Sequence, residues 1–330
     1  MTCRIGFIGA GGIAGRHIGN LSGFDDVRIV AVADPAADRA GEAAARCGAR
    51  AYSDHRAMLD AERLDACYVC VPPFAHGAPE HDLLDRGIPF FIEKPLAADG
   101  EVAEAIGARV AQARLVTAVG YHWRYLDTTE EARERLAARP ARLVNGYWLD
   151  STPPPAWWSR QDQSGGQMVE QTTHILDLAR LLVGPVEEVF AFGGRTPRAD
   201  HPDCDVDEAS TASLRFRSGA VGAVSSTCLL RWPHRIGLNL FSDGMAIELT
   251  EFEIMVDVGE GRPVRGAQGD PFAREDRDFI DAVMGRENRI RAPYAEALET
   301  HRLAVAAARS ARERRPIALG GATTAEVFHG

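Results

Sequence analysis

The sequence lacks the features that would place the protein in a membrane, outside the cell or on a nucleic acid. None of its 330 residues belongs to an apolar run of roughly 18, the length of a membrane-spanning helix. The segment "MTCRIGFIGAGG" has neither the basic nor the apolar region of a signal peptide. A net charge of −10 argues against nucleic-acid and anionic-membrane surfaces. We therefore expect a cytoplasmic protein with neither partner.

Cysteine is scarce, with six residues scattered along the chain, as is typical of a reducing compartment. Cys67 and Cys70 form a C-x-x-C pair, but they lie in the apolar run "ACYVCV", which is typical of a buried strand. The sequence contains no second C-x-x-C pair and no H-E-x-x-H motif. It therefore favours packing for these cysteines and predicts no metal site.

The length of the chain favours two domains, because 330 residues exceed what one ordinary core accommodates. In residues 1–123, short apolar strands alternate with helical patterns, which is typical of a parallel sheet covered on both faces. These strands are expected at 4–9, 27–34, 66–71, 89–93 and 114–120.

Residues 124–330 have a different pattern, with longer strands joined by tight turns. Ser218-Gly219 and Asp243-Gly244 are expected at hairpin turns, which predicts an antiparallel sheet. Helices near 270–284 and 293–311 could pack back on the first domain. The predicted fold is therefore an α/β protein, with a doubly wound parallel sheet and a second α+β domain whose sheet is open and mostly antiparallel.

A glycine motif ends the first strand and opens a helix, with the spacing Gly9-x-Gly11-x-x-Ala14. Such glycines allow a tight turn and let a pyrophosphate approach the N–H groups of the helix start. Asp34 ends the second strand, where a carboxylate binds the adenosine ribose hydroxyls. Together these features indicate a Rossmann dinucleotide site. The alternative is a tight turn without a ligand and an aspartate that only ends a strand.

Asp34 favours NAD over NADP, because a carboxylate repels a 2′-phosphate. Pro35 and Ala36 follow it, so no adjacent arginine could bind that phosphate. Arg39 leaves NADP open, since its side chain could reach the same position.

The segment "FFIEKPLA" ends the fifth strand with Glu93-Lys94-Pro95. In open α/β sheets ligands lie outside the carboxyl ends of the strands, so Lys94 is expected to face the cofactor crevice. Partial burial would lower the pKa of this lysine and suit it to proton transfer. "VPPFAH" at 71–76 ends the fourth strand in the same region. The alternative is a surface lysine beside a stiff turn.

The segment "SGGQMVEQTTHILDLARLLVG", residues 164–184, carries Glu170, His174 and Asp177. On one continuous helix these spacings put the three side chains on one face. The spacing alone leaves three possibilities open, namely metal ligation, acid–base chemistry and an ordinary solvated face.

Taken together, the glycine motif, "PPFAH", "EKP" and the GG…H-x-x-D segment resemble the Gfo/Idh/MocA family nearly end to end. The resemblance implies an NAD(P)-dependent oxidoreductase of sugars or polyols. It implies that Lys94 contacts the substrate hydroxyl and the nicotinamide ribose, that His174 is the acid/base and that Asp177 anchors its helix. It also implies a cis bond before Pro95. The family usually has aspartate where this chain has Glu170, so we expect a different substrate geometry.

Candidate site residues follow from the motifs and the resemblance. The predicted cofactor-binding residues are Gly9, Gly11, Gly12, Ile13, Asp34, Pro72, His76, Glu93 and Lys94. The predicted catalytic residues are Lys94, His174 and Glu170, and the predicted substrate-binding residues are Tyr121, Arg124, Trp157, Trp158, Arg160 and His174. For the aromatic and arginine residues the alternative is packing or a solvated charge.

The resulting hypothesis is an NAD-dependent oxidoreductase that interconverts a secondary alcohol and a ketone, or a hemiacetal and a lactone, on a sugar, an inositol or a derivative. Two alternatives within enzymes are a lyase or hydrolase that recycles its NAD, and metal-dependent chemistry at Glu170 and His174. A third is a non-catalytic NAD-binding regulator. The family resemblance also implies a homo-dimer or homo-tetramer formed through the C-terminal sheet.

Overall fold

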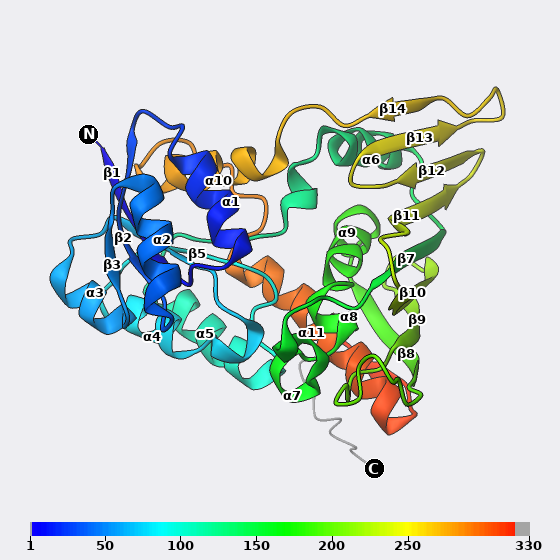
Figure 1. Cartoon of the computed structure of the whole chain (residues 1–330). Helices are drawn as coiled ribbons and strands as arrows, with labels where there is room; N and C mark the ends of the chain where they lie inside the picture. Colours follow the sequence, from blue (N-terminus) through cyan, green and yellow to red (C-terminus); the bar gives the residue numbers. More distant parts are fainter. Residues whose placement is uncertain (1, 321–330) are drawn as a thin grey trace, which may run out of the picture.

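The computed structural model describes residues 2–320, which build two sheets (Figure 1). The first sheet has six strands in the order β3-β2-β1-β4-β5-β6, and all its pairings are parallel. This confirms the predicted doubly wound sheet, although β3 was missed because it has three residues and is largely exposed. The strands are β1 (Cys3–Ile8), β2 (Val27–Ala33), β3 (Arg50–Tyr52), β4 (Ala66–Val69), β5 (Phe90–Ile92) and β6 (Thr117–Val119).

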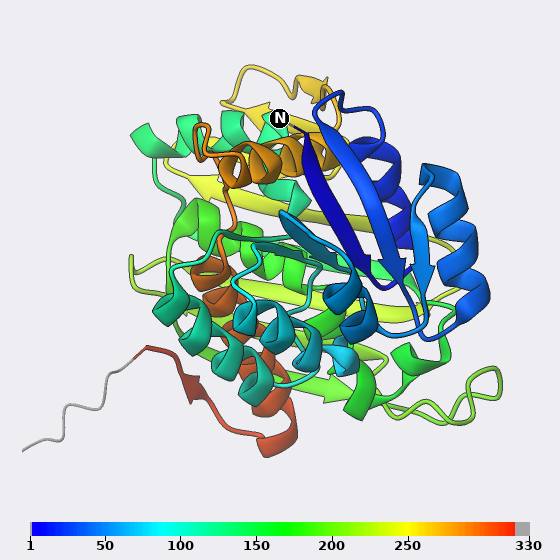
Figure 2. The ribbon, with the colours of Figure 1, turned by 90° about the vertical axis from the view of Figure 1, so that its left-hand side faces the viewer.

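Helices cover both faces of this sheet, which explains why its strands are apolar throughout. Phe91 packs with the side that carries α1 (Gly12–Leu21), α2 (Ala37–Cys47) and α10 (Pro271–Val283). Phe90 packs with the opposite side, where α11 (Tyr294–Glu313) joins three helices of the first domain. These three are α3 (His55–Ala61), α4 (Ala78–Asp85) and α5 (Gly100–Ala113). Figure 2 shows the C-terminal helices lying against the first sheet.

The second sheet has nine strands in the order β14-β13-β12-β11-β7-β10-β9-β8-β15. Its pairings are antiparallel except between β7 and β10. Gly219 and Gly244 have φ of +83° and +66° at the two predicted hairpin turns, which are confirmed. The strands are β7 (Leu143–Ser151), β8 (Val186–Gly194), β9 (Ala209–Phe216), β10 (Val221–Leu230), β11 (Arg235–Ser242), β12 (Met245–Leu249), β13 (Glu253–Asp257), β14 (Val264–Gly266) and β15 (Ile317–Ala318).

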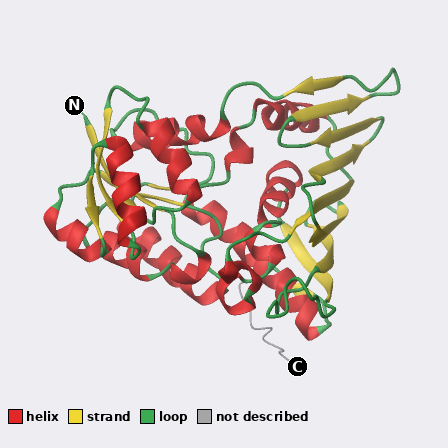
Figure 3. Cartoon of the chain, viewed as in Figure 1, coloured by secondary structure: helices red, strands yellow, loops and turns green. Residues whose placement is uncertain are grey.

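One face of the second sheet packs on α6 (Asp127–Ala138), α9 (Thr173–Val183) and α11. Figure 3 shows these helices on a single side of the sheet, with no helix of the described residues on the other. Alternate residues such as Leu238 and Ile247 face the helices and are buried. The opposite face exposes Leu143, Phe192 and Val221.

The first sheet ends at Val119 and the second begins at Leu143. The domain boundary predicted between residues 123 and 124 falls in the connecting segment, at the short 3₁₀ helix η2 (His122–Tyr125), and stays a prediction. No helix within residues 2–320 combines the length and the apolar character needed to cross a membrane.

A buried ion pair joins η2 to the second domain. Arg124 donates through Nε and Nη2 to the two carboxylate oxygens of Asp177, at 2.7 Å each. Its Nη1 donates to the carbonyl of Arg291 at 2.7 Å, and Thr300 donates to Asp177. The guanidinium of Arg124 is therefore fully engaged inside the protein, and the structure does not support it as a substrate ligand. Asp177 anchors its helix, as the family resemblance implied.

We expect Arg124→Met to lower the free energy of unfolding by about 3–5 kcal/mol, because it leaves the Asp177 carboxylate buried without its partner. Chemical denaturation of the full chain measures this difference. The matched control is Arg302→Met, which breaks an exposed pair with Glu104 and should cost at most about 1 kcal/mol. Equal losses in the two variants would contradict the anchoring role of the buried pair.

Candidate active site

The turn between β1 and α1 has the geometry of a phosphate-binding loop. Gly9 has φ of +93°, and a Cβ there would stand 2.2 Å from the carbonyl oxygen of Cys70, so only glycine fits. At Gly11 and Gly12, apart from adjoining residues and the backbone of the same helix, no atom of the described residues lies within 4 Å of the Cβ position. The N-terminus of α1 is therefore open to a ligand that approaches its backbone N–H groups.

Asp34 follows β2 and lies beside this loop. Its Oδ2 accepts from Ala10 N at 3.0 Å, and its Oδ1 accepts from Ala36 N at 2.8 Å. Arg39, whose side chain is mostly exposed, donates to Oδ1 at 2.9 Å. The backbone thus fixes the carboxylate at the edge of the open loop. A dinucleotide fits these residues, with pyrophosphate at Gly11 and Gly12 and ribose hydroxyls at Asp34.

The other predicted cofactor residues divide into two groups. Ile13 and Pro72 are partly exposed, at the start of α1 and before the 3₁₀ helix η1 (Pro73–Ala75). His76 and Glu93 are buried. His76 Nδ1 lies 2.7 Å from Glu80 Oε1, which orients the ring.

Glu93 faces the interior instead of the dinucleotide loop. Its Oε1 lies 3.0 Å from His17 Nε2, and its Oε2 accepts from Lys94 N at 3.2 Å. Gly120 faces the same carboxylate, and a Cβ there would stand 2.3 Å from Oε1. The structure therefore does not support Glu93 as a cofactor contact. Glu93 instead supports the backbone of Lys94 by accepting its N–H.

Lys94 lies at the carboxyl end of β5 and is the only lysine in the sequence. Its Nζ donates to Glu170 Oε1 and to the Glu170 carbonyl, both at 2.9 Å. The Lys94–Pro95 bond is cis, as expected. The other 36 residues of the Lys and Arg class are all arginine. A compact ammonium can approach a small hydroxyl and can exchange its protons, whereas a guanidinium stays charged.

Glu170 is held from two sides. Lys94 binds Oε1, and the indole Nε1 of Trp158 donates to Oε2 at 2.7 Å. Trp158 is 1% exposed in the 3₁₀ helix η3 (Ala156–Ser159). Trp158 was expected to bind the substrate, but it has no free face for a sugar ring. It positions the Glu170 carboxylate instead.

The segment 164–184 is not one continuous helix, and the expectation that Glu170, His174 and Asp177 share one face is wrong. Helix α8 (Gln167–Glu170) ends before α9 begins at Thr173. At the break, Thr172 N bonds to Gln167 O, and its hydroxyl bonds to Ser226 of β10 at 2.7 Å. Glu170 pairs with Lys94, while Asp177 pairs with Arg124.

His174 lies on α9 and is 4% exposed. Its ring stacks on Trp148 with centroids 5.8 Å apart and meets Tyr121 edge-on at 5.8 Å. Burial, followed by the charges of Lys94 and His122, lowers the pKa of His174 well below its ordinary value. At neutral pH the imidazole is therefore uncharged and able to accept a proton. Tyr121 is itself buried and bonded to Thr173, so it supports His174 and is not a free substrate ligand.

No spacing in the sequence pairs His174 with two of its neighbours, Trp148 and His122. Trp148 lies on β7, where strand alternation predicts an inward side chain but not the helix it meets. His122 lies 5.0 Å from His174 between ring centroids, and its Nε2 is 3.3 Å from Glu251 Oε1. The fold brings β7, η2 and the turn after β12 together around His174.

Trp157 and Arg160 border a separate hollow of about 580 Å³ that also involves Pro153 and His201. Arg160 lies within 3.8 Å of Asp162 and Asp205. None of the hydrogen bonds or ion pairs among the described residues joins either side chain to Lys94 or His174. Their substrate-binding role stays a prediction.

Comparisons with known proteins agree with this geometry. The chain is 29% identical to inositol 2-dehydrogenase of Rhizobium meliloti over 341 aligned positions, covering 97% of this chain and all of that protein. It is 28% identical to myo-inositol 2-dehydrogenase of Thermotoga maritima, over 68% of each chain. The structure of the WlbA dehydrogenase from Bordetella pertussis, in complex with NADH and UDP-GlcNAcA, shares the fold. Its TM-score is 0.85 at 23% identity, covering 97% of this chain and 99% of that one.

Two family models match successive parts of the sequence. The model described as an oxidoreductase family with an NAD-binding Rossmann fold matches residues 3–121. The GFO/IDH/MocA C-terminal domain matches residues 140–248. The resemblance inferred from the motifs is thereby confirmed, and the chain belongs to the GFO/IDH/MocA family of oxidoreductases.

Proposed function

We propose that this chain is an NAD-dependent dehydrogenase that oxidises a secondary alcohol of a sugar, an inositol or a related polyol, or a hemiacetal of one. The observation that carries the proposal is the Lys94–Glu170 ion pair beside a buried, uncharged His174, at the carboxyl end of a dinucleotide-binding sheet. The inositol dehydrogenases among its relatives support the choice of substrate class.

The chemistry divides between two groups. Oxidation of a secondary alcohol removes a proton from oxygen and a hydride from carbon, and NAD, when bound, supplies the hydride acceptor. His174 takes the proton because it is uncharged at neutral pH. The ammonium of Lys94 stabilises the negative charge that develops on the substrate oxygen. Glu170 holds that ammonium in place, and in the reverse reaction the same groups return the proton.

His122 and Glu251 separate the buried His174 from the protein surface. His174 is almost fully buried, whereas the Glu251 side chain is about one-third exposed. His122 lies between them, 5.0 Å from His174 by ring centroids and 3.3 Å from Glu251 by its Nε2.

The alternative of metal chemistry at Glu170 and His174 finds no support in the geometry. Both carboxylate oxygens of Glu170 already accept hydrogen bonds, one from Lys94 and one from Trp158. Lys94 or Trp158 would have to give up its hydrogen bond before Glu170 could bind a metal cation.

The uncovered face of the second sheet supports assembly as a homo-dimer or homo-tetramer. Leu143, Val221 and Phe192 are exposed on it, and Phe190 packs edge-on against Phe192. A second copy of the chain would cover these apolar side chains, which monomeric proteins rarely expose together.

A substrate panel tests the proposed function. We expect NADH to form from at least one inositol, sugar or sugar acid, and more slowly, if at all, with NADP. Lys94→Ala should lower kcat by about 10²–10⁴-fold because it removes the charge beside the substrate oxygen. Lys94→Arg should recover little of this loss, since the guanidinium is larger and planar. NADH binding, followed by fluorescence, controls for folding.

Turnover of Lys94→Ala at the wild-type rate would contradict the role of Lys94. Substrate consumed without net NADH would indicate the NAD-recycling alternative, a lyase or hydrolase that re-reduces its own intermediate.

Trp158→Phe tests the positioning of Glu170. The variant keeps an aromatic ring in the buried site but removes the N–H that holds Oε2. We expect kcat to fall by roughly tenfold or more with KM for NAD unchanged, because a loosened Glu170 no longer fixes Lys94. Trp232→Phe is the matched control, since Trp232 is 57% exposed. An unchanged kcat in Trp158→Phe would refute this positioning role.

A further inference from the structure

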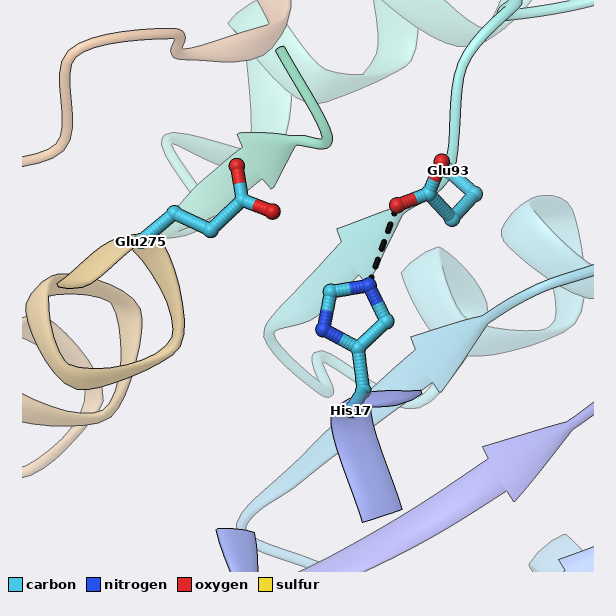
Figure 4. Close-up of side chains that lie close together, drawn as sticks. All are labelled: His17, Glu93 and Glu275. Atoms are coloured by element: carbon cyan, nitrogen blue, oxygen red, sulfur yellow. Dashed lines mark hydrogen bonds and ion pairs between the residues drawn. The ribbon is translucent and has the colours of Figure 1, made fainter. Parts of the chain in front are cut away.

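A second group of ionisable side chains lies inside the first domain, apart from Lys94 and His174. His17 comes from α1, Glu93 follows β5, and Glu275 comes from α10 (Figure 4). All three are buried, with exposures of 0%, 4% and 1%. One ligand atom from each lies within 4.8 Å of the other two. We propose that these residues bind one divalent transition-metal ion such as Mn²⁺ or Zn²⁺.

The first observation in favour of an ion is the unpartnered carboxylate of Glu275. Neither of its carboxylate oxygens has a hydrogen-bond partner within residues 2–320, although both are buried. Figure 4 shows its carboxylate directed from α10 toward His17 and Glu93. A carboxylate buried without a partner is costly, and a bound cation removes that cost.

The arrangement around His17 is the second observation. The Nδ1 of His17 lies 2.7 Å from Asp276 Oδ1, and Asn20 donates to Asp276 Oδ2 at 2.9 Å. Metal-bound histidines usually donate their other ring N–H to a carboxylate in this way, which fixes the ring and leaves the second nitrogen for the metal. Here that second nitrogen is Nε2, which faces Glu93.

The separation between ligand atoms also suits an ion. His17 Nε2 and Glu93 Oε1 are 3.0 Å apart. Two neighbouring ligands with bonds of about 2.1 Å at a right angle are separated by about 3 Å. The Glu275 carboxylate then needs only a small adjustment of its side chain to complete a three-ligand site.

The chemistry of the donors selects the class of ion. One imidazole and two carboxylates suit Zn²⁺, Mn²⁺ and similar ions, while Ca²⁺ and Mg²⁺ prefer oxygen alone and soft ions prefer sulfur. Two carboxylates balance the two charges of the ion. Because the ligands are buried, we infer that the ion is taken up on folding and not exchanged freely.

Such an ion would have a structural role near the active site. It would join α1, whose start faces the dinucleotide loop, to α10 from the far end of the sequence. It would also fix Glu93, whose Oε2 accepts the backbone N–H of Lys94. The site itself touches neither Glu170 nor His174, so the inference does not rest on the proposed dehydrogenase activity.

Metal analysis of the full chain tests the proposal. Protein purified without an immobilised-metal column is stripped with a chelator during unfolding, refolded with Mn²⁺ or Zn²⁺, and dialysed. We expect about one equivalent of ion per chain and a Tm about 5 °C above that of the metal-free protein. Bound Mn²⁺ should show coupling to one imidazole nitrogen in pulsed electron paramagnetic resonance.

Glu275→Gln and His17→Gln should both lose the ion, and His17→Gln should lose the nitrogen coupling. Glu287→Gln, on the exposed turn after α10, is the matched control and should keep it. If a variant fails to fold, the wild-type stoichiometry and nitrogen coupling decide alone.

The competing state has a charged His17 paired with Glu93 and a protonated Glu275. Less than about 0.1 equivalent of either ion after refolding, with no rise in Tm, would overturn the proposal. An infrared band of a protonated carboxyl group that disappears in Glu275→Gln would overturn it equally. None of these measurements uses a substrate, so they can fail while the dehydrogenase proposal stands.

Discussion

The ion pair between Lys94 and Glu170 is the contact on which the rest of the candidate site depends. It joins the end of a strand in the first sheet to a segment of the second domain, 76 residues apart in the sequence. Glu170 offsets the cost of partly burying the Lys94 ammonium. Burial, followed by the charges of Lys94 and His122, lowers the pKa of His174 well below its ordinary value. One position then stabilises an oxyanion while the other accepts a proton.

Contacts from several parts of the fold hold the Lys94–Glu170 pair and its surroundings in place. Glu93 supports the Lys94 peptide from inside the first domain, and Trp158 holds the far oxygen of Glu170 from the loop that precedes it. The Arg124–Asp177 pair fixes α9, on which His174 lies, against the segment that links the two sheets. The indole N–H of Trp158 donates to one carboxylate oxygen of Glu170, and Lys94 donates to the other. The two donors together fix the orientation of this carboxylate.

Sequence patterns predicted the features that depend on neighbouring residues. The glycine motif, Asp34 at a strand end, the strand-end Lys94 and the two hairpin turns all follow from local backbone rules. Contacts between residues far apart in the sequence could not be predicted from local patterns. The Thr172–Ser226 bond lies at the break in the expected helix, and no spacing within the segment signals it. Glu93 was expected at the cofactor but faces His17, whose other nitrogen meets Asp276 on α10, 259 residues away. Composition offers one further signal for the candidate site. Among 37 lysines and arginines, the single lysine is residue 94.

That single lysine also offers the most direct test of the account. Protein grown with lysine labelled at its side-chain nitrogen has one amine signal in nuclear magnetic resonance, which belongs to Lys94. We expect the signal to move when Glu170 is replaced by glutamine. It should move again when NADH and an oxidised product of an active polyol bind together to the unmodified protein. A signal that neither the substitution nor the ternary complex displaces would contradict the claim that Lys94, held by Glu170, meets the reacting oxygen.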